Sequence, residues 1–195
     1  QYWVALAGAP GAGKTTVCAG VAAALLSRGV GTAVVGMDGF HLYRRELDAM
    51  PDPAEAHRKR GAHWTFDAPK FLQRLREVRA NGRGAFPSFD HCVGDPVEDD
   101  IVVGPEHQVV IVEGNYLLLS GDDASPWNEI RPLFDQAWFL DCPESERRLR
   151  LVKRHMLTGL SKEAAELRTE DNDLPNGAFI VSHLDRAAVD RVISS

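Results

Sequence analysis

The chain has 195 residues, a formal net charge of −6 and a hydrophobic share of 44%. These values are typical of one globular domain with a full core. Acidic residues outnumber basic ones, which argues against nucleic acid as a partner, because nucleic-acid-binding surfaces are usually basic. The sequence has neither an 18-residue apolar run nor a basic leader, so we expect no membrane segment and no signal peptide. Its three widely spaced cysteines predict reduced thiols in a cytoplasmic protein.

Short apolar runs alternate with helical patterns along the chain. In chain order we predict a strand at 3–7, a helix at 14–28, a strand at 32–36, an irregular stretch at 37–65, a helix at 67–79, a hairpin within 83–107, strands at 109–112 and 136–140, helices from 141 to 157 and from 161 to 171, and a strand at 188–193. Asp67 and Asp141 are the predicted N-caps of their helices. This alternation predicts an α/β fold with a doubly wound, five-stranded parallel sheet in a single domain, residues 1–195.

Residues 8–15 match the phosphate-loop pattern G-x-x-x-x-G-K-[ST] in full, between a predicted strand and a predicted helix. Glycines let successive amides point inward, and the helix N-terminus adds partial positive charge, so the segment suits a triphosphate. We therefore expect ATP and Mg²⁺ as cofactors. The predicted cofactor-binding residues of the loop are Gly8, Ala9, Pro10, Gly11, Ala12, Gly13, Lys14, Thr15 and Thr16. In this prediction Lys14 reaches the β- and γ-phosphates and Thr15 holds the metal ion.

An acidic residue follows each of two predicted strands. Asp38 follows the second strand and Glu113 the third, and parallel strands end together at the ligand-binding edge of such a sheet. Asp38 could accept a proton from an attacking hydroxyl or hold Mg²⁺, and Glu113 could bind Mg²⁺ or orient the attacking group. We therefore predict Lys14, Asp38 and Glu113 as catalytic residues, and Thr15, Asp38 and Glu113 as metal ligands. Alternatively, Asp38 caps a turn beside Gly39, and Glu113 is the ion-pair partner of Lys14.

The phosphate loop, the segment Met-Asp-Gly-Phe-His at 37–41 and Val-Ile-Val-Glu-Gly-Asn-Tyr at 110–116 together resemble the phosphoribulokinase / uridine kinase / pantothenate kinase family of P-loop kinases. Within it, the segments at 94–100, 113–119 and 172–176 resemble a subgroup described as nucleoside-kinase-like or fructose-transport-kinase-like. The resemblance implies that Asp38 is the catalytic base and that Pro-Ser-Phe-Asp-His at 87–91 contributes to the acceptor site. Gly-Phe-His follows Asp38 where uridine kinases have Ser-Phe-Tyr, which argues against uridine as the acceptor.

The family resemblance also implies a small helical lid, at about residues 154–173, whose arginines Arg154 and Arg168 contact the ATP phosphates; alternatively, these arginines belong to a solvated helix face. Long segments at strand ends usually carry function. The predicted acceptor-binding residues, taken from those segments and the family motifs, are His41, Arg44, Asp90, His91 and Tyr116.

These features predict an ATP-dependent phosphotransferase that acts on a hydroxyl of a small molecule, such as a nucleoside, a sugar or a similar alcohol. A homodimer is possible for this fold. Two alternatives are a P-loop ATPase or nucleotide-dependent switch without an acceptor, and a protein that binds ATP without transfer. The sequence has no Asn-Lys-x-Asp guanine motif, which argues against the switch.

Overall fold

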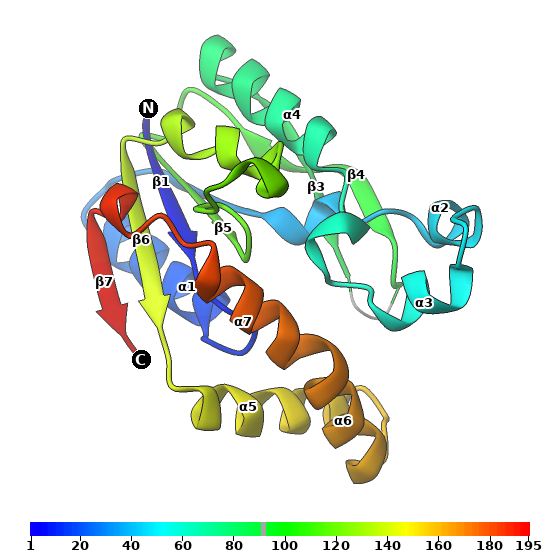
Figure 1. Cartoon of the computed structure of the whole chain (residues 1–195). Helices are drawn as coiled ribbons and strands as arrows, with labels where there is room; N and C mark the ends of the chain where they lie inside the picture. Colours follow the sequence, from blue (N-terminus) through cyan, green and yellow to red (C-terminus); the bar gives the residue numbers. More distant parts are fainter. Residues whose placement is uncertain (91–92) are drawn as a thin grey trace.

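The computed structural model describes residues 1–90 and 93–195. At its centre is a parallel sheet whose strands lie in the order β2-β5-β1-β6-β7, with helices on both faces (Figure 1). Its strands are β1 (Tyr2–Ala7), β2 (Thr32–Gly36), β5 (Val109–Gly114), β6 (Gln136–Asp141) and β7 (Arg191–Ser194). The predicted doubly wound, five-stranded parallel sheet is therefore confirmed. The predicted hairpin is also present, as the antiparallel pair β3 (Gly84–Phe89) and β4 (Pro96–Val103).

The helices of the described chain are α1 (Lys14–Leu26), α2 (Arg44–Asp48), α3 (Pro53–Arg58), α4 (Ala68–Asn81), α5 (Glu144–Leu157), α6 (Lys162–Arg168) and α7 (Leu174–Ser182). Asp67 caps α4 as predicted, because its carboxylate accepts a hydrogen bond from the amide of Lys70. Short 3₁₀ turns lie at Met37–Phe40, His63–Thr65, Asp122–Ala124, Trp127–Glu129, Arg131–Leu133 and Arg186–Ala188.

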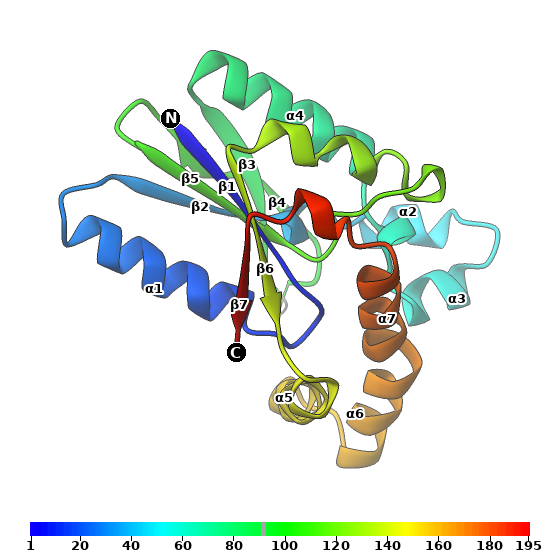
Figure 2. The same ribbon diagram turned by 60° about the vertical axis from the view of Figure 1, so that its left-hand side comes forward.

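The two faces of β1 support two separate cores, as the period of a strand requires. Trp3 and Ala5 point into the larger core, which includes residues of α4 and of the 115–134 segment. Leu6 points the other way, into a smaller core that includes Cys18 of α1. Figure 2 shows α1 on one side of the sheet and α4 and α7 on the other. Both faces of the central strand are therefore buried.

Residues 37–65, predicted to be irregular, instead contain α2, α3 and two 3₁₀ turns, so this prediction was wrong. The helices are five and six residues long, too short for a clear apolar period. Side chains near their N-termini stabilise them. Asp52 accepts a hydrogen bond from the amide of Glu55, and Glu46 accepts one from the amide of Tyr43.

Three predicted boundaries in the last third of the chain were also wrong. Asp141 ends β6 and does not cap the next helix, which begins at Glu144 after Pro143. The predicted helix 161–171 stops at Arg168 and continues through a π-helical turn, Thr169–Asp173, into α7, which was missed. Pro175 lies in the first turn of α7, directly after the π-helical turn. The last strand begins at Arg191 and not at residue 188.

Within residues 1–90 and 93–195, none of the helices combines the length and the apolar character needed to cross a membrane.

Gly39 lets the turn after β2 lie directly against β3. A Cβ atom at position 39 would fall 2.0 Å from the carbonyl oxygen of Pro87, whereas a Cβ at Gly20, in the middle of α1, would meet nothing within 4 Å. We expect Gly39→Ala to lower the free energy of unfolding by about 2 kcal/mol through overpacking. Gly20→Ala should raise it by about 0.5–1 kcal/mol through helix propensity. Urea unfolding measures both, and equal effects would contradict this packing.

Candidate active site

Three neighbouring strands end at the same level and present the candidate catalytic groups. Glu113 of β5 lies opposite Leu6 of β1 and Gly36 of β2 in the sheet register. The phosphate loop follows β1 directly, and Asp38 lies two residues beyond Gly36. The sheet therefore brings the loop, Glu113 and Asp38 to one edge, as the sequence predicts for the carboxyl ends of parallel strands.

The predicted phosphate loop forms a tight turn between β1 and α1. Gly11 and Gly13 have φ angles of 78° and 99°, a region that favours glycine. The amide of Ala12 donates to the carbonyl of Ala9 at 3.1 Å, which closes the turn, and α1 begins at Lys14. The loop thus ends at a helix N-terminus, where unpaired amides and the helix dipole favour an anion.

The Lys14 side chain bends back over this loop and is almost fully buried, with 9% exposure. Its Nζ donates to the carbonyl of Gly8 at 3.0 Å and to Oδ1 of Asn115 at 2.7 Å. Burial lowers the pKa of Lys14, the charges of Glu113 and Asp38 oppose that shift, and Arg154 adds to it. One ammonium group therefore lies within electrostatic reach of both predicted carboxylates and of the predicted lid arginine.

Glu113 is connected to the loop through Thr15. The Thr15 hydroxyl donates to Oε1 of Glu113 at 2.8 Å. Burial raises the pKa of Glu113; the charge of Lys14 lowers it, and that of Asp38 raises it further. A threonine hydroxyl and two carboxylates form the all-oxygen donor set that Mg²⁺ prefers, with phosphate oxygens or water at its remaining positions. These residues therefore fit the predicted metal ion.

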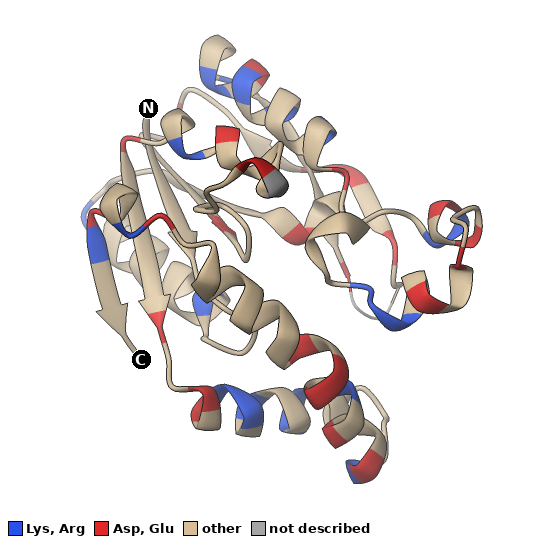
Figure 3. Cartoon of the chain, viewed as in Figure 1, with Lys and Arg blue, Asp and Glu red and all other residues tan. Residues whose placement is uncertain are grey.

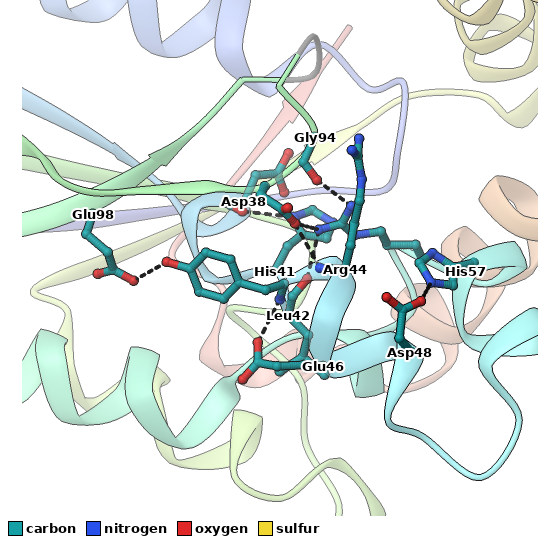
Figure 4. Close-up of polar contacts among 12 residues, drawn as sticks. Asp38, His41, Leu42, Arg44, Glu46, Asp48, His57, Gly94 and Glu98 are labelled. Carbon is teal, nitrogen blue, oxygen red and sulfur yellow. Dashed lines mark hydrogen bonds and ion pairs between the residues drawn. The ribbon is translucent and has the colours of Figure 1, made fainter.

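Asp38 lies in the 3₁₀ turn after β2, and His41 is held just beyond it. Nδ1 of His41 lies 2.8 Å from the carbonyl oxygen of Asp38 (Figure 4). The imidazole is packed against two aromatic rings, with centroids 4.0 Å from Phe66 and 4.5 Å from Phe89. The main chain at Asp38 is thus braced from its C-terminal side.

The other predicted acceptor residues have different environments. Arg44 is the first residue of α2 and is exposed, and Asp90 is exposed at the end of β3. Tyr116 is fully buried, and its hydroxyl donates to the carbonyl of Gly61 at 2.6 Å. Burial raises the pKa of Tyr116. The position of Tyr116 favours a structural role, and its assignment to the acceptor stays a prediction. His91 lies outside the described residues.

The two predicted lid arginines point to different neighbours. Arg154, at the C-terminal end of α5, influences the pKa of Lys14, and its Nη2 lies 3.9 Å from Oδ1 of Asp173. Arg168, at the end of α6, influences the pKa of Arg60 instead. Figure 3 shows the basic residues along α5, the helix that follows β6. Arg154 therefore lies in the electrostatic environment of the phosphate loop, whereas the assignment of Arg168 to ATP stays a prediction.

Sequence reasoning missed three residues that contribute to this site. Asn115 accepts a hydrogen bond from Lys14 and positions it. Arg60 connects two loops beside His41. Asp173 accepts a hydrogen bond from Nε2 of His155 at 2.7 Å. Only Asn115 had a sequence signal, because it follows Glu113 at a strand end. Arg60 and Asp173 come from segments whose local pattern gives no indication of a tertiary partner.

Residues 3–158 match the model of the phosphoribulokinase / uridine kinase family. The chain belongs to this family. It is an ATP-dependent kinase that phosphorylates a hydroxyl of a small molecule, which confirms the predicted reaction class.

Similar proteins support the same family assignment. A Schizosaccharomyces pombe protein provisionally named a uridine kinase is 42% identical over 93% of this chain and 78% of its own length. The ATP-dependent kinase-like protein notR′ of Aspergillus versicolor is 44% identical over 75% of this chain and 88% of its own. A solved structure from Silicibacter sp. TM1040, provisionally described as a fructose transport system kinase, has a TM-score of 0.88 and 35% identity, covering 99% of this chain and 89% of its own.

The raised pKa of Glu113 predicts a pH dependence of stability. Above the pKa of Glu113 in the folded protein, this carboxylate is ionised in both the folded and the unfolded state, and its burial destabilises the fold. As the pH falls through that pKa, the folded state takes up a proton before the unfolded state does. We therefore expect the wild type to gain stability relative to Glu113→Gln as the pH falls from 7 towards 4.5, measured by urea unfolding. The pKa of Glu98 is lowered, chiefly by its bond with Lys70, so the comparison with Glu98→Gln should show the opposite slope. Equal slopes would contradict the buried state of Glu113.

Proposed function

We propose that this kinase uses Asp38 as the general base, Lys14 and the loop amides to hold the ATP phosphates, and Thr15 and Glu113 to hold Mg²⁺. The observation that carries the proposal is the sheet register, which brings the phosphate loop with its buried Lys14, Glu113 and Asp38 to one edge of the sheet. Phosphoryl transfer needs positioning and charge stabilisation more than covalent participation, and this arrangement supplies both.

The substrates would react across the space between the loop and Asp38. The acceptor oxygen attacks the γ-phosphorus, the bond between that phosphorus and the β–γ bridging oxygen breaks, and ADP leaves with the electron pair. Asp38 takes the proton of the attacking hydroxyl. When bound, Mg²⁺ would neutralise charge on the phosphate oxygens.

Arg154 is the lid residue that this proposal assigns to the phosphates. Its guanidinium is about half exposed and is only weakly engaged by Asp173, at 3.9 Å, so it can turn towards a bound triphosphate. The neighbouring His155 is buried and holds Asp173 firmly, which keeps this acceptor in place while Arg154 exchanges partners. In this proposal the lid comprises the C-terminal end of α5, the helix α6 and the π-helical turn.

We expect Asp38→Asn to lower kcat by a factor of about 10² or more while the dissociation constant for ATP changes little, because it removes a base and leaves the phosphate cradle intact. A coupled assay of ADP release measures kcat, and equilibrium titration measures ATP binding. Asp99→Asn is the matched control, because Asp99 is an exposed residue of β4 paired with Arg74. An unchanged kcat in Asp38→Asn would remove Asp38 from the role of base.

A screen of ADP release over nucleosides, sugars, sugar acids and vitamin-like alcohols tests the transfer itself. The proposal predicts that at least one acceptor raises ADP release well above the rate without acceptor, with stoichiometric formation of its phosphate ester. A steady ATPase rate that no acceptor changes would favour the alternative of an ATPase or nucleotide-dependent switch.

A further inference from the structure

Three arginines that follow Asp38 in the chain form a group next to His41: Arg44, Arg60 and Arg168. Arg60 is central to it: Nη1 donates to the carbonyl of Gly94, and Nη2 donates to the carbonyl of Leu42 at 2.8 Å. Its guanidinium carbon lies 5.4 Å from the ring centre of Phe89. Burial lowers the pKa of Arg60, and the charges of Arg44 and Arg168 lower it further. The three side chains, here called the arginine cluster, therefore share one electrostatic environment.

The Arg44 side chain lies against the main chain of Gly94, beside the guanidinium of Arg60. A Cβ atom at Gly94 would fall 1.7 Å from Nη2 of Arg44, so only glycine leaves room for the guanidinium there. The Arg44 amide donates to Oδ1 of Asp95 at 2.9 Å, and the same oxygen accepts from Arg60 at 3.2 Å. The loop before β4 thus fixes the N-terminus of α2 and leaves the Arg44 side chain exposed.

Arg168 is the last residue of α6, in the lid, and its charge lowers the pKa of Arg60. The π-helical turn that follows it is attached to the end of α3, where Asn172 Nδ2 donates to the carbonyl of Arg60 at 2.9 Å and Lys59 Nζ donates to the carbonyl of Asp171. This contact places the end of α6 above residues 59–61. The lid therefore contributes one cation to the acceptor side of the molecule.

The charges of the cluster are not balanced. Among the described residues, Asp95 is the only carboxylate in an ion pair with it, and no carboxylate in that part of the chain pairs with Arg44 or Arg168. Arginines of other helices are paired, such as Arg58 of α3 with Glu55 and Arg148 of α5 with Glu170. Within residues 1–90 and 93–195, the three arginines thus form a single ion pair, in a protein whose net charge is −6.

We propose that the phosphoryl acceptor carries an anionic group, a carboxylate or a phosphate ester, which Arg44 and Arg168 bind while Arg60 holds their supports in place. This inference rests on the proposed function and adds the class of its substrate. Guanidinium groups suit both anions because their planar donors match two oxygens at once. The hydroxyl of the acceptor would then point towards Asp38 and its anion away from the ATP phosphates, which keeps like charges apart.

Acceptors that share one scaffold and differ in charge test this proposal. We expect gluconate or glucose 6-phosphate to be phosphorylated with a kcat/KM at least about tenfold above that of glucose, and fructose 6-phosphate to exceed fructose in the same way. A preference for the acid over the ester, or the reverse, identifies which anion the cluster binds. Equal kcat/KM values for the neutral and charged members would overturn the proposal.

Single substitutions test which arginines bind the anionic group of the acceptor. Arg44→Gln and Arg168→Gln should each raise the KM of the charged acceptor by about tenfold or more and leave the KM of ATP within about twofold. Arg45→Gln is the matched control, because Arg45 neighbours Arg44 on α2 but lies over the ring of Tyr43, 4.7 Å from its centre. A rise in the KM of ATP in Arg168→Gln would place Arg168 on the nucleotide and contradict its role here.

A binding measurement keeps this test separate from that of the proposed function. With the phosphate loop occupied by the magnesium complex of a non-hydrolysable ATP analogue, calorimetric titration with inorganic phosphate should show binding that the double variant Arg44→Gln/Arg168→Gln loses and Arg45→Gln keeps. Absence of phosphate binding in the wild type would overturn the anion site. Phosphate binding that persists while no acceptor is ever phosphorylated would support the anion site and contradict the proposed function.

Discussion

The site depends on the burial of one positive charge. An ammonium group is costly to remove from water unless carbonyls and opposite charges surround it. In this fold the carbonyl of Gly8 and the amide oxygen of Asn115 accept hydrogen bonds from Lys14, and two carboxylates lie within electrostatic reach. The ammonium is thus held at the point where the phosphate loop meets the ends of the strands.

This arrangement explains why the acids have different surroundings. Glu113 is hydrogen-bonded to Thr15 and has its pKa raised by burial, so its oxygens are engaged with the loop. Asp38 lies on a separate turn, whose main chain contacts His41, and the His41 ring packs against Phe66 and Phe89. These surroundings fit the roles proposed above, with Glu113 on the nucleotide side of the site and Asp38 on the acceptor side.

The sequence predicted those parts of the molecule in which local pattern and function coincide. The phosphate loop has a defined spacing, and Asp38 and Glu113 follow recognisable strands, so their meeting at one sheet edge could be predicted. The short helices α2 and α3 could not, because capping by Asp52 and Glu46 and packing against distant segments decide their structure. The continuation of α6 through a π-helical turn into α7 was missed as well. Arg60 became visible only through its tertiary contacts.

The most direct test of the central claim is calorimetric titration of the wild type and of Lys14→Ala with the magnesium complex of a non-hydrolysable ATP analogue. If Lys14 is the buried cation that holds the phosphates, the wild type binds one equivalent and Lys14→Ala binds at least about 10² times more weakly, on the scale of a lost charge-assisted contact in a desolvated site. Equal affinities in two folded proteins would contradict the account.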